Sequence, residues 1–432
     1  MTRFAALLAV VVAAAACSSP SPAPPPRTEA AAPPVPWAVT LAPGAVGTAA
    51  GSMAPQLTRH AAGIVVSWLE TGSAGRATLK YAERTAAGWS RAQTVASGTD
   101  WFVSWADVPS VSRLADGTLV AQWLKNVDAS IEAYDLRLST SHDHGRTWTT
   151  PFAPHHDKTR TQHGFASLFA WPEPGDSFGL VWLDGREQEL DTKDPQGGAM
   201  ALYYARYDRA GKQLAEAAVN ARVCECCSTS VAITSEGPIV AFRDRSDTEV
   251  RDIHVSRFEK GTSAATAGTW SPPVAVHADN WKIDSCPVNG PAIAADGTTV
   301  AVAWFVVKGE EGHAYAAFSR DGGRSFGEPI RLDDTVSVGH VGIEMLPGGA
   351  AAATWVEFTG GRARLRLRRV EPSGGRSAAV EVAGAGDGHV GGHPRVARAG
   401  NELVLAWTES QSEGDEGPGQ QVHVATATIP SP

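Results

Sequence analysis

Four of the five cysteines lie far from the N-terminus, and they carry the most distinctive chemistry in this sequence. Cys224, Cys226 and Cys227 share one Cys-x-Cys-Cys segment, and Cys286 opens the segment Cys-Pro-Val-Asn-Gly-Pro. Their thiolates are soft ligands for copper or zinc. In an oxidising compartment they form two disulfides instead, for example one between the two segments and one within the first. One disulfide with two thiols left for redox exchange or metal delivery is the third alternative.

Several histidines precede short apolar runs in the same way as the cysteine segments do. They are His163, His340, His389 and His393. Imidazole nitrogens bind copper and zinc, and they combine with thiolates in many metal sites. The predicted metal, copper or zinc, would be bound by Cys224, Cys226, Cys227, Cys286, His163, His340 and His393.

Arginines and carboxylates form a second group of candidates. Guanidinium groups hold an anion through paired hydrogen bonds, and a carboxyl group near them serves as an acid or base. The alternative interpretation is that each of these residues is a solvated loop charge. The residues predicted to be catalytic in a hydrolase are Arg186, Arg243, Arg245, Asp244 and Glu357, with Arg251 and Glu409 as further candidates.

An internal repeat determines how these residues are positioned. A Gly-containing turn, a short apolar run and an aromatic residue recur every 51 to 62 residues, and in most copies an acidic residue follows two places later. The spacing is typical of one four-stranded blade of a β-propeller. Polar turns separate short apolar runs that lack a helical period, so the fold class is all-β. The aromatic anchors are Trp68, Trp123, Trp182, Phe242, Trp304, Trp355 and Trp407.

Seven anchors predict seven blades, with six as the alternative count. Only one strand follows Trp407, at 421–429, and we predict that residues 37–41 supply the missing outer strand and close the ring. This closure leaves no open sheet edge. In a propeller, the loops after the second strands and before the innermost strands open on one face. The cysteine, histidine and arginine segments are expected there, around the axis.

Two further segments match a known turn motif. Residues 141–148, Ser-His-Asp-His-Gly-Arg-Thr-Trp, match the Asp-box Ser-x-Asp-x-Gly-x-Thr-Trp, residues 319–326 are a conservative variant, and 373–377 are a worn copy. In this motif Asp accepts backbone N–H bonds and Gly takes the positive-φ position. The mature chain therefore resembles the sialidase superfamily of β-propellers with Asp-box (BNR) repeats. It is also similar to exported sialidase-like proteins that carry the same pair of cysteine segments.

The resemblance implies the fold more than catalysis, because non-enzymatic relatives also carry Asp-boxes. Sialidases use three arginines to hold a carboxylate, an acidic acid/base, and a tyrosine nucleophile paired with glutamate. This sequence has no Arg-Ile-Pro segment near the first blade and no tyrosine after Tyr315, whereas the nucleophile of the family normally lies late in the chain.

The N-terminal residues have the features of a secretory leader. Arg3 precedes an apolar stretch that is too short to span a membrane, and Cys17 follows small residues as in a lipobox, although Ala14 stands where Leu is usual. We predict a signal peptide with lipobox at 1–17, a Pro/Ala/Ser-rich linker at 18–36 and the propeller at 37–432. The expected location is outside the cytoplasm, lipid-anchored to the bacterial cell envelope in the periplasm or on the cell surface. Plain secretion is the alternative.

The net charge of −9 argues against a nucleic-acid partner or an anionic membrane surface, so the membrane is reached only through the anchor. We expect a monomer that binds a small molecule, a glycan or a metal ion at the axial mouth. The alternatives are an exo-acting glycoside hydrolase of sialidase type and a protein-interaction scaffold.

Overall fold

The computed structural model describes residues 35–172, 175–188, 199–261, 268–383, 389–410 and 419–430. Cys17, the predicted signal peptide and most of the linker lie outside these residues. The described residues belong to a single compact unit. In this part of the chain, no helix has the length and apolar character needed to cross a membrane.

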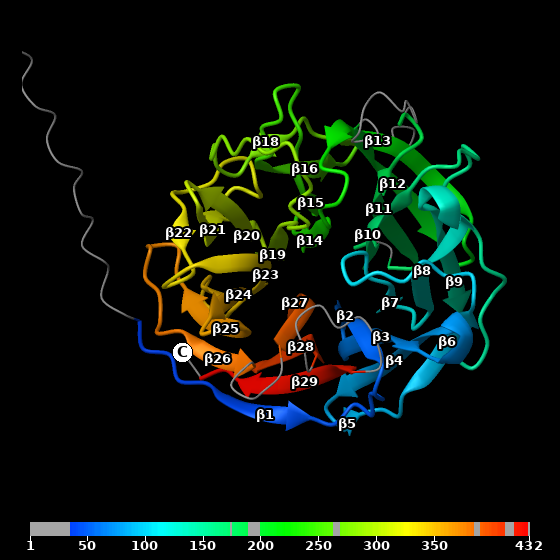
Figure 1. Cartoon of the computed structure of the whole chain (residues 1–432), viewed down its shortest axis with the longest axis horizontal. Helices are drawn as coiled ribbons and strands as arrows, with labels where there is room; N and C mark the ends of the chain where they lie inside the picture. The colour runs from blue at the N-terminus through cyan, green and yellow to red at the C-terminus, as the bar shows by residue number, and fades with distance from the viewer. Residues whose placement is uncertain are drawn as a thin grey trace, which may run out of the picture. The chain divides into compact units, whose positions relative to one another are not determined.

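Seven antiparallel sheets surround a central axis, as Figure 1 shows. The fold is a seven-bladed β-propeller, so the predicted fold class is confirmed and the alternative count of six is wrong. The strands of the first three blades are β2 (Ser52–His60), β3 (Gly63–Thr71), β4 (Ala77–Thr85), β5 (Gly88–Trp89) and β6 (Gln93–Gly98), then β7 (Ser110–Arg113), β8 (Leu119–Asp128) and β9 (Ala133–Ser141), then β10 (His163–Ala170), β11 (Ser177–Asp184), β12 (Met200–Asp208) and β13 (Gln213–Val223).

The remaining four blades follow the same order, with the innermost strand first. Two short 3-10 helices, η1 (Ser73–Gly75) and η2 (Ala129–Ile131), lie in turns between second and third strands. The strands of the last four blades are β14 (Ser230–Thr234), β15 (Gly237–Arg243), β16 (Ile253–Glu259), β17 (Thr269–Trp270) and β18 (Val274–Ala275), then β19 (Ala292–Asp296), β20 (Thr299–Lys308), β21 (Glu311–Ser319) and β22 (Ile330–Arg331), then β23 (Ser337–Met345), β24 (Ala351–Thr359), β25 (Arg362–Val370) and β26 (Val380–Ala383), then β27 (His389–Ala399), β28 (Glu402–Ser410), β29 (Gln420–Thr428) and β1 (Thr40–Gly44).

The N-terminal strand closes the ring, as predicted. β1 pairs with β29 from Thr40 opposite Thr428 to Gly44 opposite Val424, and Figure 1 shows the two strands side by side. The paired segment begins three residues later than expected. Trp37 and Val39, which precede it, contribute packing instead and lie with Leu41 of β1 against the core of the last two blades.

The repeated aromatic anchors all lie on second strands, and their role is to fill the core between blades. Trp68, Trp182 and Trp355 are fully buried. Residues two apart in a strand point to the same face, so the acidic residue of the repeat reaches the indole N–H. The indole of Trp304, which has no acid two places later, donates to Asp279 at 2.7 Å. The repeat pairs are Trp68 with Glu70 at 3.1 Å, Trp182 with Asp184 at 2.7 Å, Trp355 with Glu357 at 2.9 Å and Trp407 with Glu409 at 3.2 Å.

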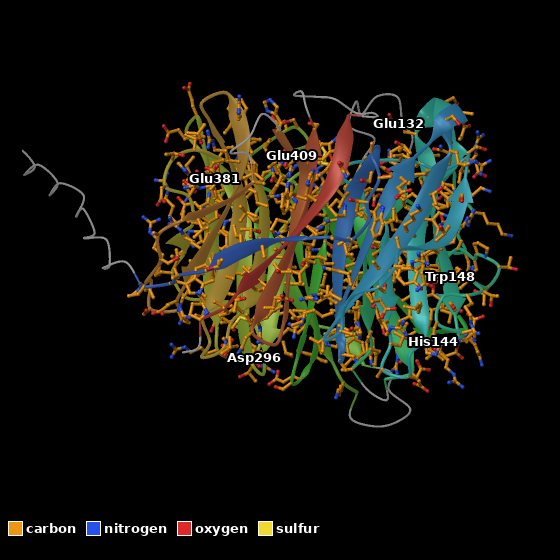
Figure 2. The ribbon with its side chains drawn as sticks, turned by 90° about the horizontal axis from the view of Figure 1, so that it is seen from below. Glu132, His144, Trp148, Asp296, Glu381 and Glu409 are labelled. Atoms are coloured by element: carbon orange, nitrogen blue, oxygen red, sulfur yellow. A yellow bond between two sulfur atoms is a disulfide. The ribbon has the colours of Figure 1, made fainter. Side chains whose placement is uncertain are left out.

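The propeller has two different faces. The loops that follow second strands and precede innermost strands open on one face, here called the top face, and Glu132 and Glu409 mark it in Figure 2. His144 and Asp296 mark the opposite, bottom face. The turn of residues 141–148 lies on the bottom face. There Asp143 accepts a hydrogen bond from the backbone N–H of Thr147 at 2.9 Å, as the motif predicts.

A cavity of about 540 Å³ runs along the axis. Its wall is formed by residues from all seven innermost strands, among them Ser110, Ser167, Val341 and Arg395. The predicted cysteine and histidine segments lead into these strands at the top face. The fold therefore places these segments around the axis at the top face, although none of the predicted cysteines or histidines lines the cavity itself.

Candidate functional site

The four predicted cysteines form two disulfides. Cys224 pairs with Cys227, with 5.6 Å between the Cα atoms, and Cys226 pairs with Cys286 at 6.1 Å. The second bond joins the loop before β14 to the loop before β19, so it fastens blade four to blade five. The sequence left three arrangements of these cysteines open. The structure has the one with two disulfides, one between the two cysteine segments and one within the first segment. In this oxidised form the four sulfurs offer no thiolate to a metal ion.

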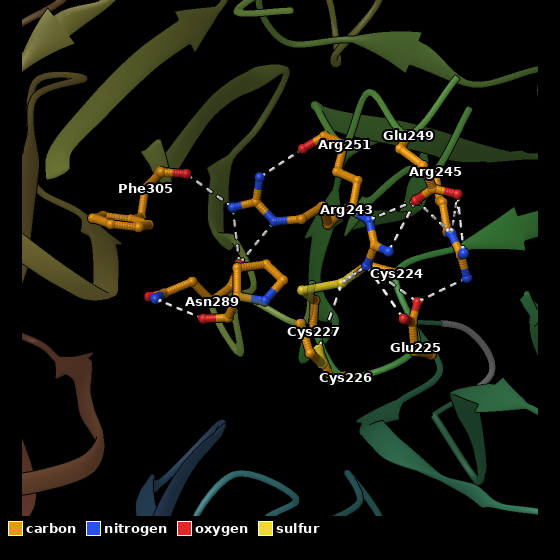
Figure 3. The surroundings of a disulfide bond; sticks show 12 residues. Cys224, Glu225, Cys226, Cys227, Arg243, Arg245, Glu249, Arg251, Asn289 and Phe305 are labelled. Atoms are coloured by element: carbon orange, nitrogen blue, oxygen red, sulfur yellow. Dashed lines mark hydrogen bonds and ion pairs between the residues drawn. A yellow bond between two sulfur atoms is a disulfide. The ribbon is translucent and has the colours of Figure 1, made fainter. Parts of the chain in front are cut away.

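A network of buried charges surrounds the Cys224–Cys227 disulfide, as Figure 3 shows. Arg251 is fully buried and donates to Glu225 at 3.2 Å, to Glu249 at 3.0 Å and to the Cys224 sulfur at 3.7 Å. Arg245 donates to Glu249 at 2.9 Å and to Glu225 at 3.3 Å. Arg245, together with Arg251, lowers the pKa of Glu249 to about 2. Through Glu225 and Cys224, the network connects the disulfide loop to the turn after β15 by charge-assisted hydrogen bonds.

Arg243 connects blades four and five through hydrogen bonds. Only 2% of it is exposed. Its Nε and Nη2 donate to the Asn289 carbonyl at 3.0 and 2.9 Å, and Nη2 also donates to the Phe305 carbonyl at 2.9 Å. Nη1 donates to the Arg251 carbonyl at 2.7 Å. Every guanidinium nitrogen of Arg243 therefore has a backbone partner, as Figure 3 shows.

The other predicted catalytic residues make contacts in separate networks. Arg186 donates to both oxygens of Asp184, at 2.9 and 2.8 Å, and lies 3.9 Å above the ring centre of Tyr203. It also pairs with Glu216 at 2.9 Å. Asp244 accepts from the Asn220 amide at 2.8 Å. Glu357 accepts from Trp355 within the structural repeat.

Two predicted histidines meet at the axis. Nδ1 of His340 lies 3.2 Å from Nδ1 of His393, so one ring carries its proton on Nδ1 and the other accepts it. Burial, with a smaller contribution from Arg395, lowers the pKa of His340 to about 4, and burial also lowers the pKa of His393. Both rings are therefore neutral at pH 7. Trp105, from the loop before β7, stacks on His393 at 5.6 Å and meets His340 edge-on at 5.8 Å.

Backbone bulges interrupt four of the innermost strands near the top face. β2, β10, β23 and β27 each have a register shift near the top face. Each shift contains a residue with positive φ, and these residues are Ala54 at 52°, Phe165 at 51°, His340 at 50° and Gly392 at 63°. Positive φ is unfavourable for residues other than glycine and clusters at functional sites. Bulges redirect side chains in the same way next to binding sites.

His163 has different neighbours from the other two predicted histidines. It is fully buried, and its ring lies parallel to that of His155 at 3.7 Å between centres. Asp135, Asp157 and Asp184 face its nitrogens at 3.6, 3.3 and 3.6 Å. Sequence reasoning missed His155 and Asp157. The available signal was their place in the segment just before His163, which leads to an innermost strand.

An aromatic loop before β7 also escaped the sequence analysis. Trp101, Phe102 and Trp105 are partly exposed on the top face, and Phe102 stacks on Tyr134 at 4.0 Å. Asp107 follows them and is almost fully buried, and this burial raises its pKa to about 7. Because strongly shifted pKa values cluster at functional sites, Asp107 and the aromatic loop join the candidate residues.

No family model matches this chain, and no curated protein matches it. Among solved structures, the polysaccharide lyase Uly1 is similar over 89% of this chain and 92% of its own, with 11% identity and a TM-score of 0.50. The α-L-arabinanase of Penicillium chrysogenum, complexed with arabinobiose, is similar over 77% and 95%, with 14% identity and a TM-score of 0.47. The NanB sialidase of Streptococcus pneumoniae is similar over 90% and 94%, with 8% identity and a TM-score of 0.46. At these identities the likeness concerns the β-propeller fold alone.

Proposed function

We propose that this chain is a cell-envelope propeller that binds a saccharide at the axial mouth of its top face and does not hydrolyse it. The observation that carries the proposal is the position of Trp105, a partly exposed residue whose ring stacks on His393 and meets His340 edge-on. Aromatic ring faces pack against the C–H faces of sugars, and neutral imidazoles exchange hydrogen bonds with hydroxyl groups.

Binding is favoured over sialidase-type hydrolysis by the partners of the arginines. Arg186, Arg243 and Arg245 are each engaged by carboxylates or carbonyls of the chain itself. A substrate carboxylate would have to displace these partners and leave buried polar groups without a hydrogen bond, at a cost of about 1–3 kcal/mol for each group. The missing late tyrosine argues in the same direction.

Attachment to the envelope is part of the proposal. Its supports are the lipobox-like sequence around Cys17 and the two disulfides, which are typical of oxidising compartments. Replacing Cys17→Ala is expected to abolish radioactive palmitate labelling and to move the protein from the membrane fraction to the soluble fraction. Unchanged fractionation would contradict the anchor and leave the binding proposal standing.

The binding proposal is tested with an array of neutral and acidic oligosaccharides, followed by calorimetric titration of the tightest one. Trp105→Ala is expected to weaken binding at least tenfold, about 1.4 kcal/mol. Trp89→Ala is the matched control, because Trp89 lies on the short outer strand β5, in the turn region after β4, on the bottom side. Equal affinities of the two variants, or no binding by the intact protein, would overturn the proposal. Release of sialic acid from α2,3-sialyllactose would support the hydrolase instead.

A further inference from the structure

Seven equivalent positions form a ring around the axial cavity, and one of them carries a charge. Each lies on an innermost strand, opposite the residue that directly precedes the aromatic anchor of the second strand. All seven line the cavity. Blades five and six have Ala292 and Gly342 at this position, and blade seven has Arg395, the only charged member. The other four members have neutral polar side chains, and they are Gln56, Ser110, Ser167 and Ser230.

Arg395 has no partner among the described residues, although it is only partly exposed. Its Nε is buried without a hydrogen-bond partner. Burial lowers its pKa to about 10, and no nearby carboxylate opposes this effect. The fully buried Arg243 and Arg251, by contrast, each donate to several carbonyl or carboxylate oxygens. Because a charge held away from bulk water needs compensation, Arg395 indicates an anion that comes from outside the chain.

The one carboxylate on the cavity wall is already bound elsewhere. Glu344 is the only acidic residue among the described residues that line the cavity. It follows Gly342 by two residues, about 7 Å further along β23, and it accepts a hydrogen bond from Arg59 at 2.8 Å. Burial raises its pKa, and the cations that oppose this rise are Arg59 and Arg398. The cavity wall therefore has one uncompensated positive charge, at Arg395.

Arg395 also lies close to the axial mouth. It follows His393 by two positions on β27, and next to burial its charge is the cause that lowers the pKa of His340. Nε2 of His393 is itself buried without a hydrogen-bond partner. Trp105 contacts both histidines from the loop before β7. Two polar groups without partners, two residues apart on one strand, therefore lie where the mouth meets the cavity.

We propose that Arg395 binds an oxyanion, namely a carboxylate, sulfate or phosphate group, in the axial cavity. A guanidinium presents paired N–H groups that match two oxygens of such a group. Within the same ring, Ser110 Oγ has no hydrogen-bond partner and Ser230 Oγ accepts from the Ile293 N–H, so both hydroxyls have a proton to donate. A neutral ligand would leave the charge of Arg395 uncompensated.

The anion is either free in solution or the charged group of a saccharide held at Trp105. Only the second case rests on the proposed function. The anion site itself is argued from Arg395 and the cavity, so it is tested first with an inorganic anion.

The test uses the whole propeller with both disulfides closed, dialysed into a chloride buffer. Sodium sulfate is titrated by calorimetry at constant ionic strength, and urea midpoints are measured with and without sulfate. We expect one sulfate per chain and a midpoint that rises with sulfate concentration, because sulfate binds the folded state. Arg395→Met removes the charge and should weaken sulfate binding at least tenfold. The midpoint gain that remains in this variant is the general stabilisation by sulfate, which is excluded from protein surfaces.

The matched control is Arg398→Met. Arg398 lies three residues further along β27, donates to the Gly400 carbonyl at 3.0 Å and does not line the cavity. The variant loses the same charge and should bind sulfate as the parent does. Equal sulfate affinity of the two variants would overturn the proposal, as would a parent that binds none of sulfate, phosphate and acetate.

Stability without sulfate separates an anion site from a structural role of Arg395. Arg395→Met should then unfold at no lower urea concentration than the parent, because an uncompensated charge has been removed. A variant that is less stable than the parent, or that fails to fold, would show that the guanidinium has a partner within the fold, and the proposal would be wrong.

Two carboxylates distinguish the source of the anion. Sodium acetate carries the group alone, and sodium glucuronate carries it on a sugar ring. If glucuronate binds more tightly than acetate, and Trp105→Ala removes the difference, the ligand of the proposed function is an acidic saccharide. Equal affinities indicate a free anion. Binding of a neutral oligosaccharide without any anion binding would overturn the anion site and leave the saccharide proposal standing.

Discussion

Glu357 was predicted to be catalytic, but its contacts indicate a role in the stability of the fold. It is 5% exposed and accepts the indole N–H of buried Trp355 at 2.9 Å. Replacing Glu357→Ala should lower the free energy of unfolding by about 1–3 kcal/mol, because the indole N–H would be left unsatisfied. Glu357→Gln keeps an acceptor and should cost less than about 1 kcal/mol. Equilibrium urea unfolding measures both.

Glu310→Ala serves as the control for this comparison, since Glu310 is exposed in the turn after β20. It should shift the unfolding free energy by no more than about 0.5 kcal/mol. If Glu357→Ala unfolds at the same urea concentration as this control, the indole–carboxylate pair has no role in stability. The repeat would then need another explanation.

Asp107 makes stability depend on pH in an unusual direction. Burial raises its pKa in the folded protein to about 7, whereas an unfolded Asp titrates near 3.9. The folded state therefore binds more protons between about pH 4 and 7, and its stability falls as pH rises through this window, by up to about 1.4 kcal/mol per pH unit from this group. Asp107→Asn removes the effect. The variant should gain stability relative to the parent chain from pH 4 to pH 7, and no further above it.

Urea unfolding of the parent and of Asp107→Asn at several pH values measures this difference. Asp247→Asn is the control, because the Asp247 side chain is 96% exposed and should give a pH-independent difference near zero. A stability difference between Asp107→Asn and the parent that does not change with pH would show that Asp107 titrates normally.

At the scale of elements, the two disulfides constrain very different lengths of chain. Cys226 and Cys286 are separated by 60 positions, and Cys224 and Cys227 by three. Closing the longer loop removes more entropy from the unfolded chain, which predicts a stabilisation of about 4 kcal/mol, against about 2 kcal/mol for the shorter loop. The double variant Cys226→Ser/Cys286→Ser should therefore unfold at a lower urea concentration than Cys224→Ser/Cys227→Ser. The reverse order would contradict the pairing or the entropic account.

A thiol assay addresses the pairing before any variant is made. Protein that lacks Cys17 should show no reactive thiol in denaturant without reductant, because all four remaining cysteines are bonded. After reduction it should show all four. Any thiol that reacts before reduction would favour the mixed arrangement, with free cysteines available for exchange or metal binding.

Strands could be predicted from the sequence where the residue pattern within a single strand determines which of its side chains are buried. The anchors from Trp68 to Trp407 identify all seven second strands, because each aromatic residue ends a short apolar run of its own strand. In four of them the acid two places later also accepts from the indole, so that pair is local as well. Contacts between blades were not predictable in this way. Trp105 belongs to blade two and His340 to blade six, and they meet only because the closed propeller brings both blades to a common axis. The bulge in β23 also changes the direction of the His340 side chain. Four cysteines permit three pairings, and the sequence cannot choose among them.

The buried cluster of Asp135, His155 and His163 shows the same limit. His163 was identified because its position in the repeat is equivalent to that of His340. Asp135 belongs to a third strand and His155 to a connection, where the repeat assigns no functional position. Their approach depends on how two neighbouring blades pack. A sequence pattern with a period of one blade does not contain that information.

At the scale of the whole molecule, stability depends on closure of the ring by β1. This strand pairs with β29 over five residues, and Trp37, Val39 and Leu41 add apolar packing just before it and at its start. A chain that begins at Ala45 loses these contacts and exposes the edge of β29, which is a template for pairing with another chain. It should lose on the order of a few kcal/mol of stability and form dimers or aggregates. Its Tm and its mass by light scattering after size exclusion measure both effects.

A chain that begins at Val35 is the control. It keeps β1 and the hydrogen bond from the Val35 N–H to the Arg376 carbonyl, so it should remain a monomer with the Tm of the full-length chain. If the chain from Ala45 is equally stable and monomeric, the seventh blade is complete with three strands, and closure by the N-terminal strand is not what holds the ring together.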